Sequence, residues 1–170
     1  RAWLAYARGE ARGADGDHAG AGAAYEDAIA LAASVGNPFV VSVGESSLAN
    51  ELARAGFQQH ALKVYAACLD GHRRHGNLVH AVTTLRNLAD WLAAIGEYRD
   101  AAIIGAAVSR PGLRQTDGRD ADDQASTDES IGQQVGASLA DEWAATGREL
   151  DLVAAIEHAG TAVRHLLSPP

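Results

Sequence analysis

Three glycines, Gly16, Gly56 and Gly96, recur at a fixed interval of 40 residues along this 170-residue chain. Other positions keep the same register: Ala21, Ala61 and Ala101, the pairs Gly36-Asn37 and Gly76-Asn77, and Tyr25 and Tyr65. A fixed period in this range is typical of repeat proteins, in which each supersecondary unit stacks on the next. The repeat constrains the fold more than any other feature of the sequence.

Each repeat carries the residues expected of a helical hairpin. Gly36 and Gly76 can adopt the left-handed conformation that ends a helix. Asn37 and Asn77 can then cap the helix that follows, and Pro38 suits a first helical turn, where no backbone N–H is needed. The three glycines of the 40-residue series are expected to turn the chain between the two helices of each hairpin.

Apolar residues between these glycines recur with the period of an α-helix. One such stripe consists of Ala61, Leu62, Tyr65, Cys68 and Leu69. Because a helix with a single apolar face must bury that face against a neighbour, we expect the helices to pack together. No segment has the alternating pattern of a strand. We predict an all-α fold with helices over 2–12, 17–35, 38–55, 58–75, 78–95 and 97–108.

The repeat pattern stops after Val108, and residues 115–124 are almost wholly polar. We predict a loop here, with order resuming near Ser126, where Ser126 and Glu129 match a capping box. Asp151 can cap a last helix. The sequence therefore predicts three helical hairpins over 1–108, a polar loop over 109–125, and helices over 126–170 that cap the open end of the repeats.

Charge and composition narrow the partners. A formal net charge of −8 argues against direct binding of nucleic acid or of an anionic membrane. The only basic cluster, 72–75, is expected to complement a helix dipole at its C-terminus. Cys68 is the single cysteine, and no long apolar run or signal peptide is present, which predicts a cytoplasmic protein. Since the chain starts at Arg1 and has no Met, we expect it to belong to a longer protein.

Motifs of catalysis and cofactor binding are missing from the sequence. There is no G-x-x-x-x-G-K-[ST] loop, and Leu48 stands where a nucleophile elbow around Ser46 needs glycine. The seven histidines lack the spacing of a metal site. Cys68 takes the place of a small residue of the other repeats and is expected to be a buried hydrophobe. We predict no enzyme activity, no cofactor and no metal.

The positions that recur every 40 residues resemble those of tetratricopeptide repeats. The small, small, aromatic, small pattern of that family occurs at Gly9, Ala21, Tyr25 and Ala28 in the first unit and at Ala61, Tyr65 and Cys68 in the second. In the third unit Gly105 replaces the aromatic residue. The resemblance implies a right-handed solenoid of antiparallel helical hairpins with C-terminal capping helices.

The period of 40 exceeds the usual tetratricopeptide length of about 34 residues. Longer hairpins of this kind look like the solenoid of large bacterial signal-transduction ATPases that regulate transcription, such as the maltose-regulon activator type and the LuxR type. The segment 139–155, with Trp143 and Asp151, looks like the end of that solenoid in high-GC bacteria, where some members carry an adenylate-cyclase-like domain.

The resemblance implies a non-catalytic interaction or sensor module. Its partner would be a protein, a peptide or another domain of the parent regulator, and a homo-oligomer is also compatible with it. The alternative is a regulatory domain that binds a small-molecule inducer.

In tetratricopeptide proteins the first helix of each hairpin lines the concave face, where solenoids bind their ligands. Alignment by the repeat tyrosines puts on that face Trp3, Tyr6 and Glu10, then Val43, Ser46, Asn50 and Arg54, then Thr83, Arg86, Asn87 and Asp90. Peptide-binding members hold a main chain or a carboxylate with Asn and basic residues, some of which Glu10 and Asp90 replace here. Arg86 and Asp90 can pair across one helical turn. The alternative is an ordinary solvated polar face.

Overall fold

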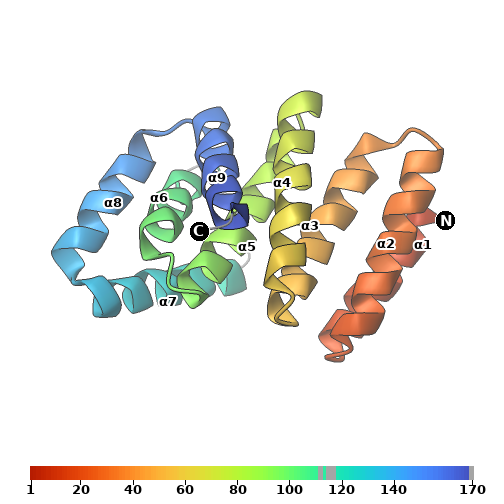
Figure 1. The fold of residues 1–170 in the computed structure, drawn as a ribbon, viewed down its shortest axis with the longest axis horizontal. Helices are drawn as coiled ribbons and strands as arrows, with labels where there is room; N and C mark the ends of the chain where they lie inside the picture. Colours follow the sequence, from red (N-terminus) through yellow and green to blue (C-terminus); the bar gives the residue numbers. More distant parts are fainter. Residues whose placement is uncertain (111–112, 114–117, 169–170) are drawn as a thin grey trace. The chain divides into compact units, whose positions relative to one another are not determined.

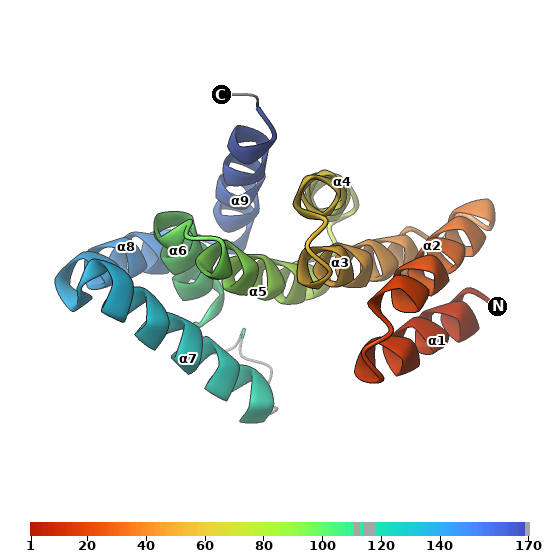
Figure 2. The same ribbon diagram turned by 60° about the horizontal axis from the view of Figure 1, so that its bottom comes forward.

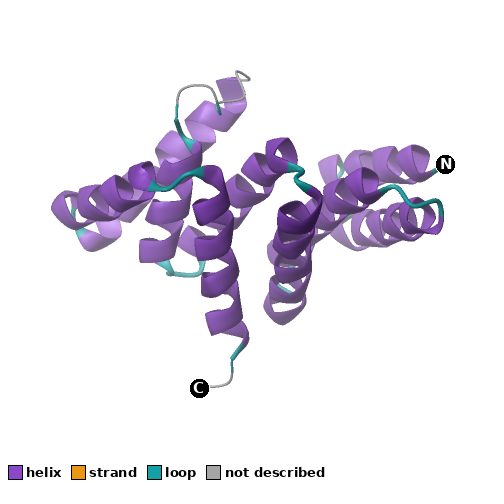
Figure 3. Cartoon of the chain, turned by 90° about the horizontal axis from the view of Figure 1, so that it is seen from above, coloured by secondary structure: helices purple, strands orange, loops and turns teal. Residues whose placement is uncertain are grey.

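The structure is a computed structural model that describes residues 1–110, 113 and 118–168, with the side chains of 118–123 left undescribed. Every regular element in these ranges is a helix, and none is a strand (Figure 3). The helices are α1 (Ala2–Ala14), α2 (His18–Ser34), α3 (Pro38–Arg54), α4 (Gln58–His75), α5 (Leu78–Ala94), α6 (Tyr98–Val108), α7 (Gly118–Val135), α8 (Ala137–Glu149) and α9 (Leu152–Leu167). The prediction of an all-α chain is confirmed for these residues.

The first six helices begin and end where the repeated glycines and caps place them. The five glycines at the helix junctions, from Gly16 to Gly96, have positive φ angles between 65° and 91°. Asn37 caps α3, since its side chain accepts a hydrogen bond of 3.2 Å from the backbone N–H of Val40, and Pro38 lies in the first turn. The cap expected from Asn77 stays a prediction.

The C-terminal third differs from its prediction. Helix α7 begins at Gly118, so the loop predicted over 109–125 is too long, and residues 111–112 and 114–117 lie outside the described residues. Ser126 is inside α7 and does not start a helix. The start of α7 was missed because its first turns carry charged and amide side chains with no apolar stripe. Asp151 does cap α9, because its Oδ1 accepts from the backbone N–H of Ala154 at 2.8 Å.

Contacts within the chain divide it into two compact units, residues 1–80 with 163–170 and residues 81–162. In the first unit, α1 packs against α2, α2 against α3 and α3 against α4, and α1 also reaches α3 (Figures 1 and 2). Ala21, Tyr25 and Leu48 form a buried cluster there. Gly9 permits a close approach of α1 and α2, since a Cβ at this position would lie only 2.5 Å from the Tyr25 ring.

In the second unit, α6 packs against α8, and α7 contacts both. Its core includes the fully buried side chains of Leu85, Leu88, Leu92, Ile103, Ile104 and Ile131. Gly147 on α8 lies so close to the backbone carbonyl oxygen of Ile103 on α6 that no side chain would fit between them. Each unit thus has a glycine that permits the close approach of two helices.

Candidate functional site

A strip of aromatic rings crosses the first unit. Trp3 and Tyr6 are one turn apart on α1, and their ring centroids lie 5.5 Å apart in an edge-to-face arrangement. Trp3 also contacts Phe39 of α3 at 6.1 Å, and Tyr6 contacts Tyr25 of α2 at 5.5 Å. Phe39 in turn lies 4.7 Å from the His80 ring at the start of α5. We call these five side chains, contributed by four helices, the aromatic strip.

Much of the aromatic strip faces solvent at one end. The exposed fractions of Trp3 and Phe39 are 51% and 43%, whereas Tyr25 at the other end is 3% exposed. Large apolar side chains that remain in contact with one another at the surface mark interaction sites more often than isolated ones do. The exposed end of the strip is therefore suited to bind another molecule.

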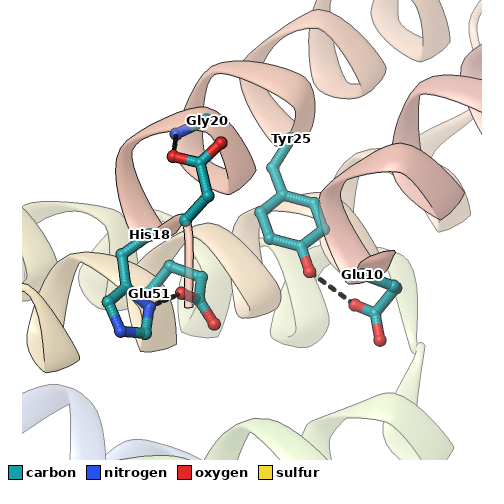
Figure 4. A network of polar contacts seen from close by, with 6 residues as sticks. Glu10, His18, Gly20, Tyr25 and Glu51 are labelled. Atoms are coloured by element: carbon teal, nitrogen blue, oxygen red, sulfur yellow. Dashed lines mark hydrogen bonds and ion pairs between the residues drawn. The ribbon is translucent and has the colours of Figure 1, made fainter. Parts of the chain in front are cut away.

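A carboxylate is held in place beside this strip. Tyr25 donates a hydrogen bond of 2.6 Å from its hydroxyl to Glu10 Oε1 (Figure 4). Ser47 Oγ lies 3.5 Å from the same oxygen and 3.2 Å from the Tyr6 hydroxyl. Burial is the main reason that the pKa values of Tyr25 and Tyr6 are raised, and Glu10 adds to both shifts. Both tyrosines therefore remain neutral, and the Tyr25 hydroxyl holds the Glu10 carboxylate in place.

A second carboxylate lies deeper in the same unit. Glu51 on α3 is only 7% exposed, and its Oε2 lies 2.6 Å from Nδ1 of His18 on α2 (Figure 4). A Cβ on Gly13 of α1 would come within 3.2 Å of Glu51 Oε1. Asp17 caps the same end of α2 by accepting from the Gly20 N–H at 2.9 Å. The pair joins α2 to α3 beside Gly13 of α1, and its short contact and burial indicate a structural role.

The α3 residues predicted for the concave face differ in their exposure to solvent. Ser46 and Val43 are each 7% exposed, so the expectation that they line an open surface is wrong. The reason is that α3 packs against α2 on one side and α4 on the other, which leaves it a narrower free face than the repeat alignment assumed. Asn50 is half-buried, and Arg54 is exposed.

The predicted residues on α5 are covered by segments that follow in the sequence. Arg86 donates from Nη2 to the backbone carbonyl oxygen of Leu113 at 3.0 Å. Asp90 accepts from the Thr127 hydroxyl of α7 at 2.8 Å, and Asn87 is half-buried. The expectation of a freely exposed polar face is therefore wrong for Arg86 and Asp90. Their mutual ion pair stays a prediction.

The surface that Asn50 was predicted to share with Arg86 and Asn87 also stays a prediction, because Asn50 belongs to the first unit and the other two to the second. Trp3, Tyr6 and Glu10, by contrast, are brought together. Sequence reasoning missed Phe39 and Ser47 as their neighbours. The signal was available, because Phe39 and Ser47 lie on α3, one helical hairpin after α1, but the alignment considered only positions equivalent to one another in the repeat.

No match is found when the chain is compared with protein-family models, with curated proteins and with solved structures. What the site does must therefore follow from its own geometry. Within the residues that the structure describes, no three His, Cys, Asp or Glu side chains converge as metal ligands. In the same residues, no helix has the length and apolar character needed to span a membrane.

Cys68 is buried as predicted, with an exposed fraction of 0%. Its Sγ lies 3.5 Å from the Ser42 carbonyl oxygen and 3.3 Å from Nε2 of His72. His72 does lie in the last turn of α4 as expected, but it is also fully buried. Burial, reinforced by His80, lowers the pKa of His72 to about 4. The expectation that this histidine complements the helix dipole is wrong, because it carries no charge at neutral pH.

Proposed function

We propose that this chain is a non-catalytic interaction module that binds a segment of another protein at the exposed end of the aromatic strip. The observation that carries the proposal is the contact between two exposed rings, Trp3 and Phe39, on a helix face that also holds, two turns further along α1, the Glu10 carboxylate bonded to Tyr25. Aromatic side chains dominate the energetics of protein interfaces. Because the rings and Glu10 are already held by their neighbours, a partner would lose little free energy in ordering them.

The chemistry of the strip favours a basic, partly apolar peptide. Glu10 offers a negative charge at a fixed position, and the indole of Trp3 and the ring of Tyr6 offer faces for a cation. The chain's net charge of −8 would attract such a partner over a longer range. An Arg or Lys near an apolar side chain would satisfy both parts of the surface.

The wider context is also part of the proposal. The 40-residue repeat and the helix pairs of the first unit support a right-handed, tetratricopeptide-like solenoid. Because the sequence resembles the solenoid of large bacterial signal-transduction ATPases, we propose that the chain belongs to a cytoplasmic, signal-transducing transcriptional regulator of a high-GC bacterium. The peptide would then come from a partner protein or from another domain of that regulator.

Fluorescence anisotropy with short labelled peptides tests the proposal. We expect peptides that combine Arg with Leu to bind, and the same peptides with Glu for Arg not to bind. Trp3→Ala and Glu10→Gln should each weaken binding about tenfold, the effect of losing one contact of about 1.4 kcal/mol. Phe57→Ala is the control and should leave binding unchanged, because Phe57 is also an exposed aromatic residue but lies outside the strip. Equal binding by all variants, or no binding by any basic peptide, would contradict the proposal.

The alternative, a regulatory domain for a small-molecule inducer, is favoured by a different observation. A cavity of about 380 Å³ opens between α2, α3 and α4 of the first unit, away from the residues of the aromatic strip. Its volume is within the range of sites that bind small molecules.

A further inference from the structure

The cavity between α2, α3 and α4 has an apolar wall and a charged rim. Small apolar side chains, among them Ala33, Val41 and Ala67, line its volume of about 380 Å³. Glu45 from α3 and Arg74 from the last turns of α4 lie in the same lining. Sites for small ligands combine a mostly apolar wall with a few polar groups that fix the orientation of the ligand. The cavity has that composition.

The charge of the Glu45 carboxylate is only partly compensated by the protein. The Glu45 side chain is half-buried, and burial raises its pKa, with Arg74 offsetting only part of that effect. Among the described residues, the structure gives its carboxylate no hydrogen-bond donor. A partly desolvated carboxylate in this state is costly for the protein, and a ligand ammonium group placed against it would relieve the cost.

Arg74 offers the opposite charge on the facing helix. Its Nε donates to the Asp70 carbonyl oxygen at 3.2 Å, which ties the side chain to its own helix. The remaining guanidinium N–H groups are suited to a carboxylate, which they can bind in a bidentate manner. The two ends of one small zwitterion could therefore be held by residues of two different helices.

Gly71, one turn before Arg74, leaves room beside the acid. A Cβ added there would lie 3.8 Å from Glu45 Oε2 and 3.6 Å from Ser42 Oγ, which is ordinary contact distance. A larger residue at this position would therefore not clash through its Cβ with Glu45 or Ser42. The glycine keeps space open next to the carboxylate, where a ligand ammonium would have to fit.

We propose that this cavity binds a free α-amino acid with a compact apolar side chain, its ammonium at Glu45, its carboxylate at Arg74 and its side chain against Ala33, Val41 and Ala67. The site is independent of the aromatic strip, since neither Trp3 nor Glu10 lines the cavity. The proposal supplies a ligand class for the inducer-binding alternative, and it can fail or hold whatever the fate of peptide binding.

Calorimetric titration of the full chain with three matched probes tests it. L-Valine carries both charges, isobutylamine is valine without its carboxylate, and isovalerate is valine without its ammonium. We expect saturable binding of valine and at least tenfold weaker binding of each of the other two, because each lacks one charged contact. No saturable heat with valine, or equal binding of valine and isobutylamine, would overturn the proposal.

Variants of the chain assign the contacts. Glu45→Gln and Arg74→Gln should each weaken valine binding about tenfold or more, while Arg73→Gln, an exposed arginine outside the cavity lining, should leave it unchanged. Gly71→Val should block the ligand without altering either charge. In carboxyl-labelled protein, valine should lower the pKa of Glu45 followed by NMR, and an unchanged titration of Glu45 on saturation with valine would contradict its role. If a variant fails to fold, the three-probe comparison on the unaltered chain still decides.

Discussion

Helices α1 and α5 hold equivalent places in the repeat, yet their predicted site residues end in opposite situations. On α1, Trp3 stays half-exposed and Glu10 is held only by side chains that leave it open to solvent. On α5, Arg86 and Asp90 are engaged by Leu113 and by Thr127 of α7. A repeat therefore predicts where a side chain points from its own helix, and what later covers that face depends on segments outside the repeat.

The two units also use glycine differently to bring helices together. Gly9 makes room for a side-chain ring, whereas Gly147 makes room for a backbone carbonyl oxygen, which cannot move without its helix. Gly147→Ala should therefore lower the free energy of unfolding by about 3 kcal/mol, and Gly9→Ala by about 1 kcal/mol, within the range for overpacking. Urea denaturation of both variants measures the difference. Equal losses for the two variants would contradict the close packing of α6 against α8 at Gly147.

Acid should act on the first unit through His72. The folded-state pKa of about 4 lies below the ordinary value of 6.5, so the unfolded chain binds more protons between these values. The contribution of neutral His72 to the free energy of unfolding is therefore complete above pH 6.5, and about 3 kcal/mol of it is lost as the pH drops towards 4. Urea denaturation across this pH range measures the loss. His72→Gln should flatten that part of the profile, and the exposed His75→Gln should not; an unaltered profile in His72→Gln would contradict the assignment.

The cover over α5 can be tested by Thr127→Val, which removes the hydroxyl bonded to Asp90 but keeps the shape of the side chain. We expect a loss of about 1 kcal/mol, the usual contribution of one hydrogen bond, and faster hydrogen exchange in α7. Thr146→Val is a suitable control, because the exposed Thr146 hydroxyl donates within its own helix, to the Glu142 carbonyl oxygen. Full stability of Thr127→Val would indicate that the α5 face is open after all.

The smallest expected effect on stability belongs to α1. Because Trp3 is half-exposed, Trp3→Ala should lower the free energy of unfolding by about 1 kcal/mol or less, well below the cost of truncating a fully buried aromatic residue. A thermal melt checks this, and the same variant should still lose most of its affinity for a basic peptide. A large drop in melting temperature would make Trp3 a core residue and remove it from the proposed interface.

What the sequence predicts well is local. Gly36 and Asn37 determine a helix end and a cap by chemistry that acts over a few residues, and the structure has both. Helix α7 was misplaced at its start because its polar first turns have no apolar period from which a helix could be inferred. Ser46 was misjudged because its burial depends on two neighbouring helices.

The candidate sites show the same division. Trp3, Tyr6 and Glu10 could be placed on one face of α1 from their spacing alone. Their partners Phe39 and Ser47 are more than 30 residues away in sequence, and no local pattern joins them. The cavity at Glu45 is defined by three helices at once, so only the packed structure could reveal that Glu45 and Arg74 line the same space.

The exposure of Trp3 also equips the chain with its own optical reporter. Of the three tryptophans, Trp91 is 9% exposed and Trp143 is half-buried, so collisional quenchers such as acrylamide should reach the Trp3 indole most readily. Tyr6, whose ring lies 5.5 Å away, should pass excitation energy to it. A partner that covers the end of the strip would shield this indole, and occupancy could be followed in an unlabelled protein by the fall in quenching.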